Sequence, residues 1–105
     1  MGLMGINVPA AFGGVETGYK SLCLVTQSIG RAAAPIPFTL SVYLVTEAIA
    51  RLGSDEQKSA WLPKLASGQA IGALAVTESL EQLTLESVTC SVASGVLSGT
   101  KLAVA

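Results

Sequence analysis

Hydrophobic residues change their spacing once along this chain, near Gly68. Over residues 54–68 they recur at the spacing of an amphipathic helix. The apolar face of this helix consists of Ala60, Trp61, Leu62 and Leu65. Residues 70–76 are all apolar or glycine, which is typical of a strand covered on both faces. The pattern therefore predicts helices before the change and strands after it.

Local signals mark both ends of the helix at residues 54–68. Ser54 is placed to cap the first amides, and Gln57 is placed to bond back to it in a capping box. Pro63 is expected to end or kink the first part of the helix, since proline has no amide hydrogen. Gly68 closes the remainder in the left-handed conformation that glycine tolerates.

Two earlier segments also have helical spacing. The first covers residues 18–29, with Thr17 as its predicted cap and Gly30 as its predicted end. The second covers residues 37–52, because Pro37 suits the first turn of a helix. Its apolar surface comprises Phe38, Leu40, Val42, Leu44, Val45, Ala48, Ile49 and Leu52. A helix that is apolar round most of its circumference is expected to be buried.

The C-terminal part of the sequence predicts a loop and then a hairpin. Residues 78–85 show no clear period, whereas residues 87–93 alternate with a period of two. Ser94 and Gly95 suit a two-residue hairpin turn, and residues 96–105 supply the return strand. Because an isolated hairpin is marginal in water, this one needs further strands beside it.

The composition indicates that this chain does not cover its own apolar surface. Of its 105 residues 50% are hydrophobic, the mean hydropathy is +0.61, and only 12% are charged. A typical soluble domain carries about 25% charged residues. The shortage is explained if the chain is a piece of a larger protein whose other parts cover these faces.

Charge and residue types exclude several functions. Six basic and seven acidic residues leave a net charge of −1, with no basic stripe for a nucleic-acid backbone. The lack of histidine excludes Ser-His-Asp and Cys-His catalysis and histidine-dependent metal sites. Cys23 and Cys90 are isolated, so we interpret them as small buried residues of a reducing compartment, without a metal cluster or disulfide.

No segment suggests insertion into a membrane or export. The uncharged run at residues 32–46 is shorter than the roughly 20 residues that span a bilayer. The N-terminus lacks the basic region and cleavage site of a secretory signal. The expected location is therefore the cytoplasm, or the mitochondrial matrix if the source is eukaryotic.

Several short motifs occur in the order that is typical of one enzyme family. They are Gly-Ile-Asn-Val-Pro at 5–9, Phe-Gly-Gly at 12–14, Gly-Ser-Asp-Glu-Gln-Lys at 53–58, Leu-Pro-Lys-Leu-Ala-Ser-Gly at 62–68, Ala-Leu-Ala-Val-Thr-Glu at 73–78 and Leu-Ser-Gly-Thr-Lys at 97–101. Together they span nearly the whole chain, which closely resembles the acyl-CoA dehydrogenase family.

The resemblance implies an α+β fold made of two incomplete domains. Residues 1–68 correspond to three helices at the end of an all-α N-terminal domain. Residues 69–105 correspond to the first strands of an antiparallel β-barrel domain. Full members of the family are several times longer than this chain.

The resemblance also implies a chemistry. Family members use FAD to oxidise an acyl-CoA thioester to its 2,3-enoyl product: a glutamate base removes the α-proton, and the β-hydrogen leaves as hydride to the flavin. That base lies in a C-terminal helical domain, or on another helix in some relatives, so no catalytic residue is assigned here. The implied partners are the acyl-CoA substrate, other subunits of a homo- or hetero-oligomer, and an electron-transfer acceptor.

The family motifs place candidate ligand contacts in this sequence. The implied cofactor-binding residues are Leu74, Val76, Thr77 and Ala105. The implied substrate-pocket residues are Phe38, Val42 and Val45, for which ordinary helix packing is the alternative. Thr77 and its neighbouring amides would stabilise negative charge on the reduced flavin, although Thr77 also suits a strand as a β-branched residue. Ala105 stands where the family has a threonine that addresses flavin N5.

The sequence departs from the family in two places. Ser-Leu-Glu-Gln-Leu at 79–83 replaces a glycine-rich loop, and Ala-Val-Ala at 103–105 replaces an aromatic, an aliphatic and a hydroxyl residue. One interpretation is a divergent flavin enzyme of the branch that handles bulky or steroid-like acyl-CoAs, whose Arg-Ala-x-Ala-Pro-x-Pro-Phe connector matches residues 31–38. A second is a partner subunit without a full flavin or base set. A third, a small helical interaction module, conflicts with the low content of charged residues.

Overall fold

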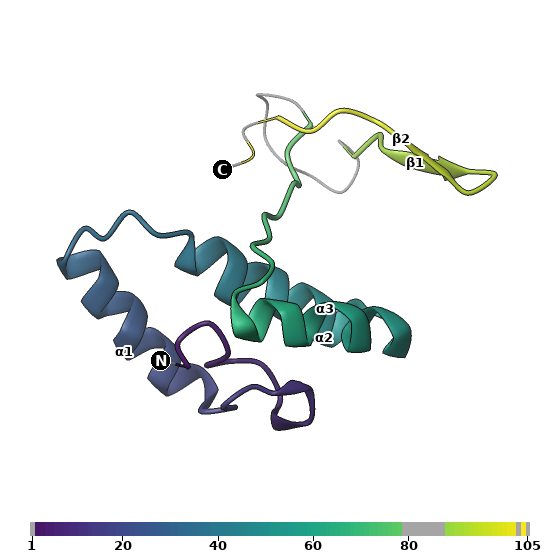
Figure 1. The fold of residues 1–105 in the computed structure, drawn as a ribbon. Coiled ribbons are helices and arrows are strands. Elements are labelled where there is room, and N and C mark those ends of the chain that lie inside the picture. Colours follow the sequence, from purple (N-terminus) through teal and green to yellow (C-terminus); the bar gives the residue numbers. More distant parts are fainter. Residues whose placement is uncertain (1, 79–87, 103, 105) are drawn as a thin grey trace. The chain divides into compact units, whose positions relative to one another are not determined.

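The fold consists of helices followed by a short hairpin, as the computed structural model in Figure 1 shows. The structure describes residues 2–78, 88–102 and 104. Within these residues three helical segments precede two antiparallel strands, which confirms the predicted α+β class. Contacts divide the chain into two compact units, Met1–Ala73 and Leu74–Ala105. The domain boundary predicted after Gly68 stays a prediction.

The first unit contains the helices. They are the 3₁₀ turn η1 (Ala10–Phe12), α1 (Gly18–Arg31), the π-helical segment η2 (Phe38–Val45), α2 (Thr46–Leu52) and α3 (Asp55–Ser67). Because η2 leads directly into α2, the two form the single helix that was predicted for residues 37–52. The helix α3 packs against both η2 and α2, and α1 contacts η2 (Figure 1). The first unit is therefore organised around the η2–α2 helix.

The core of the first unit lies where η2, α1 and the N-terminal loop meet. Phe38 and Val42 of η2 pack with Leu22 of α1 and Ile6 of the loop, and all four are buried. The burial predicted for the η2–α2 helix is therefore correct at Phe38 and Val42, whereas Leu40, Leu44 and Val45 are half-buried. It is wrong at Leu52, which is 86% exposed because it is the last residue of α2 and no further turn covers it.

The ends of α3 follow the local signals in the sequence. The Ser54 N–H donates to Gln57 Oε1 at 2.9 Å, and the Gln57 N–H donates to Ser54 Oγ at 3.3 Å, which confirms the capping box. Gly68 has a φ of 77°, which confirms the left-handed helix end. Pro63 does not end the helix, because α3 continues to Ser67.

The buried face of α3 is narrower than predicted. Leu62 and Leu65 are buried, whereas Ala60 and Trp61 are exposed. Consecutive residues differ by about 100° around a helix, so Trp61 lies away from the face that Leu62 presents to the core. Lys64 lies over the exposed Trp61 ring, 5.1 Å from its centroid.

The predicted start of α1 at Gly18 is correct, but the predicted side-chain cap and the predicted end are wrong. Thr17 makes no side-chain cap, because its hydroxyl donates instead to the Ile6 carbonyl at 3.2 Å. Gly30 does not end the helix, which continues to Arg31. The chain then turns at Ala33, whose φ of 46° is left-handed. At the first end of α1 a contact between distant residues has thus replaced the expected local one.

The second unit contains the predicted hairpin. The strand β1 (Ser91–Ala93) pairs antiparallel with β2 (Val96–Ser98). Ser94 and Gly95 have positive φ angles of 50° and 77°, which confirms the two-residue turn. Both strands are shorter than predicted, with three exposed residues each. Two strands alone bury little side-chain surface, so the pairing is limited to the residues next to the turn.

Residues 70–76 do not form the predicted strand in the part of the chain that the structure describes. They do not pair with β1 or β2, and Ile71 is 67% exposed rather than covered on two faces. A strand needs a neighbour for its backbone hydrogen bonds, and here the segment makes only isolated contacts. One of these is the Gly72 N–H, which donates to the buried Ser41 Oγ at 3.0 Å.

Candidate functional site

Three of the four predicted flavin contacts lie together at the start of the second unit. Leu74 and Val76 expose about two fifths of their surface, at 41% and 37%, and Thr77 is half-buried. Ala105 lies outside the described residues. The segment therefore presents exposed apolar side chains and a hydroxyl close together in sequence, while the role of these residues stays a prediction.

The carbonyl groups of this segment are bound by residues from the C-terminal end of the unit. The Leu102 N–H donates to the Thr77 carbonyl at 2.7 Å, and Lys101 Nζ donates to the Val76 carbonyl at 3.1 Å. A peptide unit is planar, with its N–H directed opposite to its C=O. The two bonds therefore also fix the directions of the Thr77 and Glu78 amides, the next donors along the chain.

The Glu78 carboxylate joins three stretches of the second unit. It accepts hydrogen bonds from the Thr89 N–H and Oγ1, both at 2.5 Å, and from the Cys90 N–H at 3.0 Å. It also forms an ion pair with Lys101 Nζ at 2.5 Å. The side chain of Glu78 is only 7% exposed and that of Lys101 is 24% exposed. We call these contacts of Glu78 the Glu78 cluster.

The contacts in the Glu78 cluster shift the pKa values of its titratable groups. Hydrogen bonding with Cys90, then with Lys101 and Thr89, holds the pKa of Glu78 well below its usual range. Hydrogen bonding with Glu78 raises the pKa of Lys101. The pKa of the Cys90 thiol is also raised, first by hydrogen bonding with Glu78 and then by burial. At neutral pH the cluster therefore contains a carboxylate, an ammonium group and a neutral thiol.

The sequence alone indicated no role for the side chains of Glu78 and Lys101. They are 23 residues apart, with the whole hairpin between them, so no local spacing reveals the pair. The one available signal is that both residues belong to motifs shared with the family, at 73–78 and 97–101.

The predicted substrate-pocket residues lie in the first unit. Phe38 and Val42 are 3% and 1% exposed and belong to the core described above, as the packing alternative requires. Val45 is half-buried, and a Cβ added to Gly72 would lie 2.7 Å from its Cγ1. Glycine therefore lets residue 72 approach η2 closely. A contact of these three residues with an acyl chain stays a prediction.

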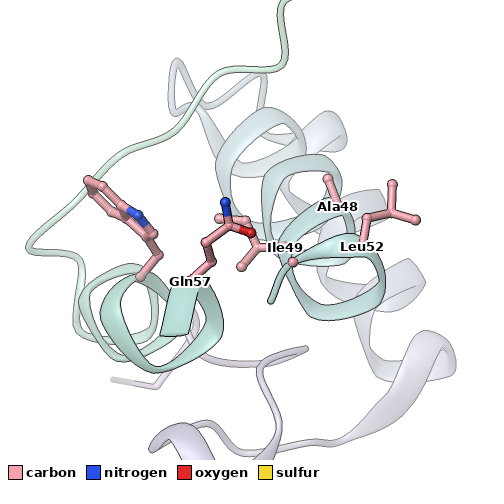
Figure 2. Close-up of a pocket in the computed structure, with 6 residues that line it drawn as sticks. Ala48, Ile49, Leu52 and Gln57 are labelled. Atoms are coloured by element: carbon pink, nitrogen blue, oxygen red, sulfur yellow. The ribbon is translucent and has the colours of Figure 1, made fainter. Parts of the chain in front are cut away.

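An apolar groove runs between α2 and α3 (Figure 2). It has a volume of about 350 Å³ and is lined by Ala48, Ile49, Leu52, Gly53, Gln57 and Trp61. Figure 2 shows Leu52 on α2 and Gln57 on α3. The lining includes no titratable side chain, so this groove offers shape and apolar surface rather than chemistry.

A second acid, the half-buried Glu47 on α2, connects three parts of the first unit. It accepts hydrogen bonds from the Tyr19 hydroxyl at 2.7 Å, from Arg51 Nε at 2.6 Å and from Asn7 Nδ2. Burial raises the pKa of Glu47, but the bonds from Tyr19, Arg51 and Asn7 outweigh burial, and its pKa is lowered. The contacts join the N-terminal loop, α1 and α2, and sequence analysis did not predict them.

The remaining expectations concern cysteines, metals and membranes. Cys23 is exposed, so its predicted burial is wrong; Cys90 is half-buried, and neither forms a disulfide. In the part of the chain that the structure describes, no group of histidine, cysteine, aspartate or glutamate side chains is arranged to hold a metal ion. Nor is any described helix both long and apolar enough to cross a bilayer.

Comparisons with known proteins agree on one family. Residues 1–69 match the family model described as acyl-CoA dehydrogenase, N-terminal domain. The chain is 38% identical over 78 residues to a mitochondrial isovaleryl-CoA dehydrogenase from Solanum tuberosum, covering 72% of this chain and 19% of that protein. It is 42% identical over 79 residues to an acyl-CoA dehydrogenase from Bacillus subtilis, covering 73% and 21%.

A further relative is the mitochondrial 2-methylacyl-CoA dehydrogenase from Solanum tuberosum. It is 37% identical over 78 residues, which cover 72% of this chain and 19% of that protein. The chain thus spans about a fifth of the length of the curated relatives it matches. No solved structure matches the chain significantly.

Proposed function

Because the chain belongs to the acyl-CoA dehydrogenase family, we propose that it is part of a flavin-dependent oxidoreductase that dehydrogenates an acyl-CoA thioester between C2 and C3. The observation that carries the proposal is the match of residues 1–69, which contain all the helices of the first unit, to the N-terminal domain of that family. The chain covers about a fifth of its relatives, so the activity belongs to the whole protein.

The start of the second unit fits one edge of a flavin ring. Leu74 and Val76 expose apolar side chains, and Thr77 carries a hydroxyl. Lys101 and Leu102 bind the carbonyls of Val76 and Thr77, so the segment offers a ligand donors rather than acceptors. Donors suit the ring carbonyls of an isoalloxazine and stabilise negative charge there. Bound FAD would supply the acceptor for the hydride that leaves the substrate.

Neither Glu47 nor Glu78 suits the role of the α-proton base. A general base works best when its pKa lies near the working pH. Glu47 and Glu78 are each held by three residues, and the pKa of each is lowered. Our proposal therefore places the base in another segment of the full-length protein, as the family resemblance implies.

The acyl group is the narrower part of the proposal. The connector at residues 31–38 supports the branch that acts on bulky or steroid-like acyl-CoAs. The names of two relatives, isovaleryl-CoA and 2-methylacyl-CoA dehydrogenase, instead favour a short branched acyl group. Rates with isovaleryl-CoA and with a steroid side-chain CoA thioester, measured on the same preparation, distinguish the two.

A partner subunit in a mixed oligomer is the alternative function. It is favoured by the departures from the family at residues 79–83 and 103–105, where the glycine-rich loop and the hydroxyl residue are replaced. In either case we propose that the protein works as a homo- or hetero-oligomer and passes electrons to a separate acceptor. The relatives include mitochondrial and bacterial proteins, so we propose the matrix or the cytoplasm as its location.

Purified full-length protein is expected to be yellow, with a flavin absorption band that an acyl-CoA bleaches and an artificial electron acceptor restores. Thr77→Val, which removes only the hydroxyl, is expected to weaken FAD binding roughly threefold to tenfold, the effect of one lost hydrogen bond. Thr100→Val is the matched control, because Thr100 is exposed beyond β2. FAD binding is measured by titrating the apoprotein.

The outcomes separate the proposals. Protein that is colourless alone and becomes active only when mixed with a sister subunit supports the alternative function. Protein that binds no FAD and shows no activity in either situation contradicts both. Yellow protein in which Thr77→Val and Thr100→Val bind FAD equally keeps the function but removes Thr77 from the site.

A further inference from the structure

We infer that Glu78 is a positioning residue for the segment that we propose to bind FAD, and that Lys101 transmits its effect. The inference rests on the proposed function. Glu78 follows Thr77 directly, yet its carboxylate is bound by Thr89, Cys90 and Lys101, and only 7% of the side chain is exposed. A carboxylate so fully engaged orients its neighbours rather than a ligand.

A short chain of contacts connects Glu78 with the Thr77 amide. Glu78 holds Lys101 Nζ at 2.5 Å, and the same nitrogen donates to the Val76 carbonyl at 3.1 Å. That carbonyl shares a rigid peptide plane with the Thr77 N–H. By holding the ammonium group, Glu78 therefore sets the direction of the Thr77 amide, one of the donors proposed for the flavin.

Glu78 is itself held in place by two residues other than Lys101. Its carboxylate accepts from the Thr89 N–H and hydroxyl and from the Cys90 N–H, which precede β1. These donors precede the hairpin in sequence, whereas Lys101 follows it, so the carboxylate is held by residues from both ends of the hairpin. The Leu102 N–H then holds the Thr77 carbonyl at 2.7 Å. The carbonyls on both sides of the Thr77 Cα are thus held by consecutive residues, Val76 by Lys101 of the Glu78 cluster and Thr77 by Leu102.

The charges of Glu78 and Lys101 also depend on each other. Glu78 and Lys101 form a pair with little exposure to water, so loss of either charge leaves the other uncompensated. In Glu78→Gln the glutamine side chain has one acceptor oxygen instead of two, and its amide nitrogen adds a donor where the Lys101 ammonium and the Thr89 and Cys90 amides are donors only. The variant keeps the size of the side chain but no longer satisfies Lys101, Thr89 and Cys90 together.

The test compares Glu78→Gln and Lys101→Met with the unaltered full-length protein. We expect each substitution to raise the FAD dissociation constant by about tenfold, the low end of the loss of metal affinity caused by changing residues that orient metal ligands. The visible circular dichroism of the bound flavin is expected to change in both, because the donors around the ring are reoriented. Lys101→Arg, which keeps the charge, is expected to recover most of the affinity.

Glu47→Gln is the matched control. It makes the same change in an acid that is also held by three residues, but in the first unit. It is expected to lower the melting temperature without changing the FAD dissociation constant or the flavin spectrum. A purely structural role of Glu78 predicts the same behaviour for both glutamate variants. Lys101→Met keeps the bonds from Thr89 and Cys90 to Glu78, so it tests the inference even if Glu78→Gln does not fold.

Two results would overturn the inference in different ways. If the unaltered protein binds FAD and Lys101→Met binds it equally well with an unchanged spectrum, the positioning role is wrong while the proposed function stands. If the unaltered protein binds no FAD, the proposed function fails and the inference fails with it.

Discussion

Truncation of Leu62 to alanine is expected to lower the free energy of unfolding by about 2–5 kcal/mol. Leu62 is 0% exposed and is the largest fully buried side chain among the described residues, on the helix that contacts η1, η2 and α2. Its removal loses the transfer free energy of the side chain and leaves a cavity that close-packed neighbours fill only in part. A loss of this size is a large fraction of the stability of a small domain.

Urea unfolding followed by tryptophan fluorescence measures this loss, because Trp61 is the single tryptophan and lies on the same helix. Leu52→Ala is the matched control. It makes the same substitution on α2 at a position that is 86% exposed, so its effect is expected to stay within about 0.5 kcal/mol. Equal effects of the two substitutions would show that α3 does not pack as described.

Replacement of Gly14 by alanine is expected to destabilise the first unit by about 3 kcal/mol. A Cβ at this position would lie 1.8 Å from the carbonyl oxygen of Val8 and 2.5 Å from its Cβ. Val8 is itself 0% exposed, so its backbone has no free space into which it could shift. The N-terminal loop would have to open, and its contacts with the core would be lost.

Gly30→Ala is the control for this second prediction, since nothing lies within 4 Å of a Cβ at Gly30. Gly30 lies within α1, where alanine is favoured over glycine by roughly 0.5–1 kcal/mol, so this variant is expected to be more stable. A urea midpoint of unfolding below that of the unaltered protein for Gly14→Ala, and above it for Gly30→Ala, would support both expectations. A Gly14→Ala midpoint at or above that of the unaltered protein would contradict the tight contact between residues 8 and 14.

The features that sequence predicted correctly depend on neighbours a few residues apart. The capping box of Ser54 and Gln57, the left-handed Gly68 and the turn at Ser94 and Gly95 are all of this kind. The wrong cap at Thr17 involves a distant contact. Thr17 bonds to Ile6 instead of capping its own helix, because a carbonyl eleven positions earlier lies within reach in the folded chain.

In the candidate site, too, the sequence predicted local features but not contacts between distant residues. The motif at residues 73–78 was enough to place Leu74, Val76 and Thr77 on one segment, because they are consecutive or nearly so. The role of Glu78 depends on Lys101, and periodicity carries no information about a partner 23 residues away. Burial on the helices was predicted only in part. The hydrophobic pattern identified Phe38 and Val42 as core residues, but it wrongly included Trp61 in the buried face of α3.

The two-residue turn of the hairpin has a consequence for the order in which the second unit folds. Ser91 pairs with Ser98, so β1 and β2 close a short loop, whereas Glu78 and Lys101 are 23 residues apart. Loop closure costs more entropy as the separation grows, and hairpins form within microseconds. We therefore expect the hairpin to nucleate early and the ion pair to close last. Pulse-labelled hydrogen exchange would then protect β2 amides before Cys90, and the reverse order would contradict this kinetic sequence.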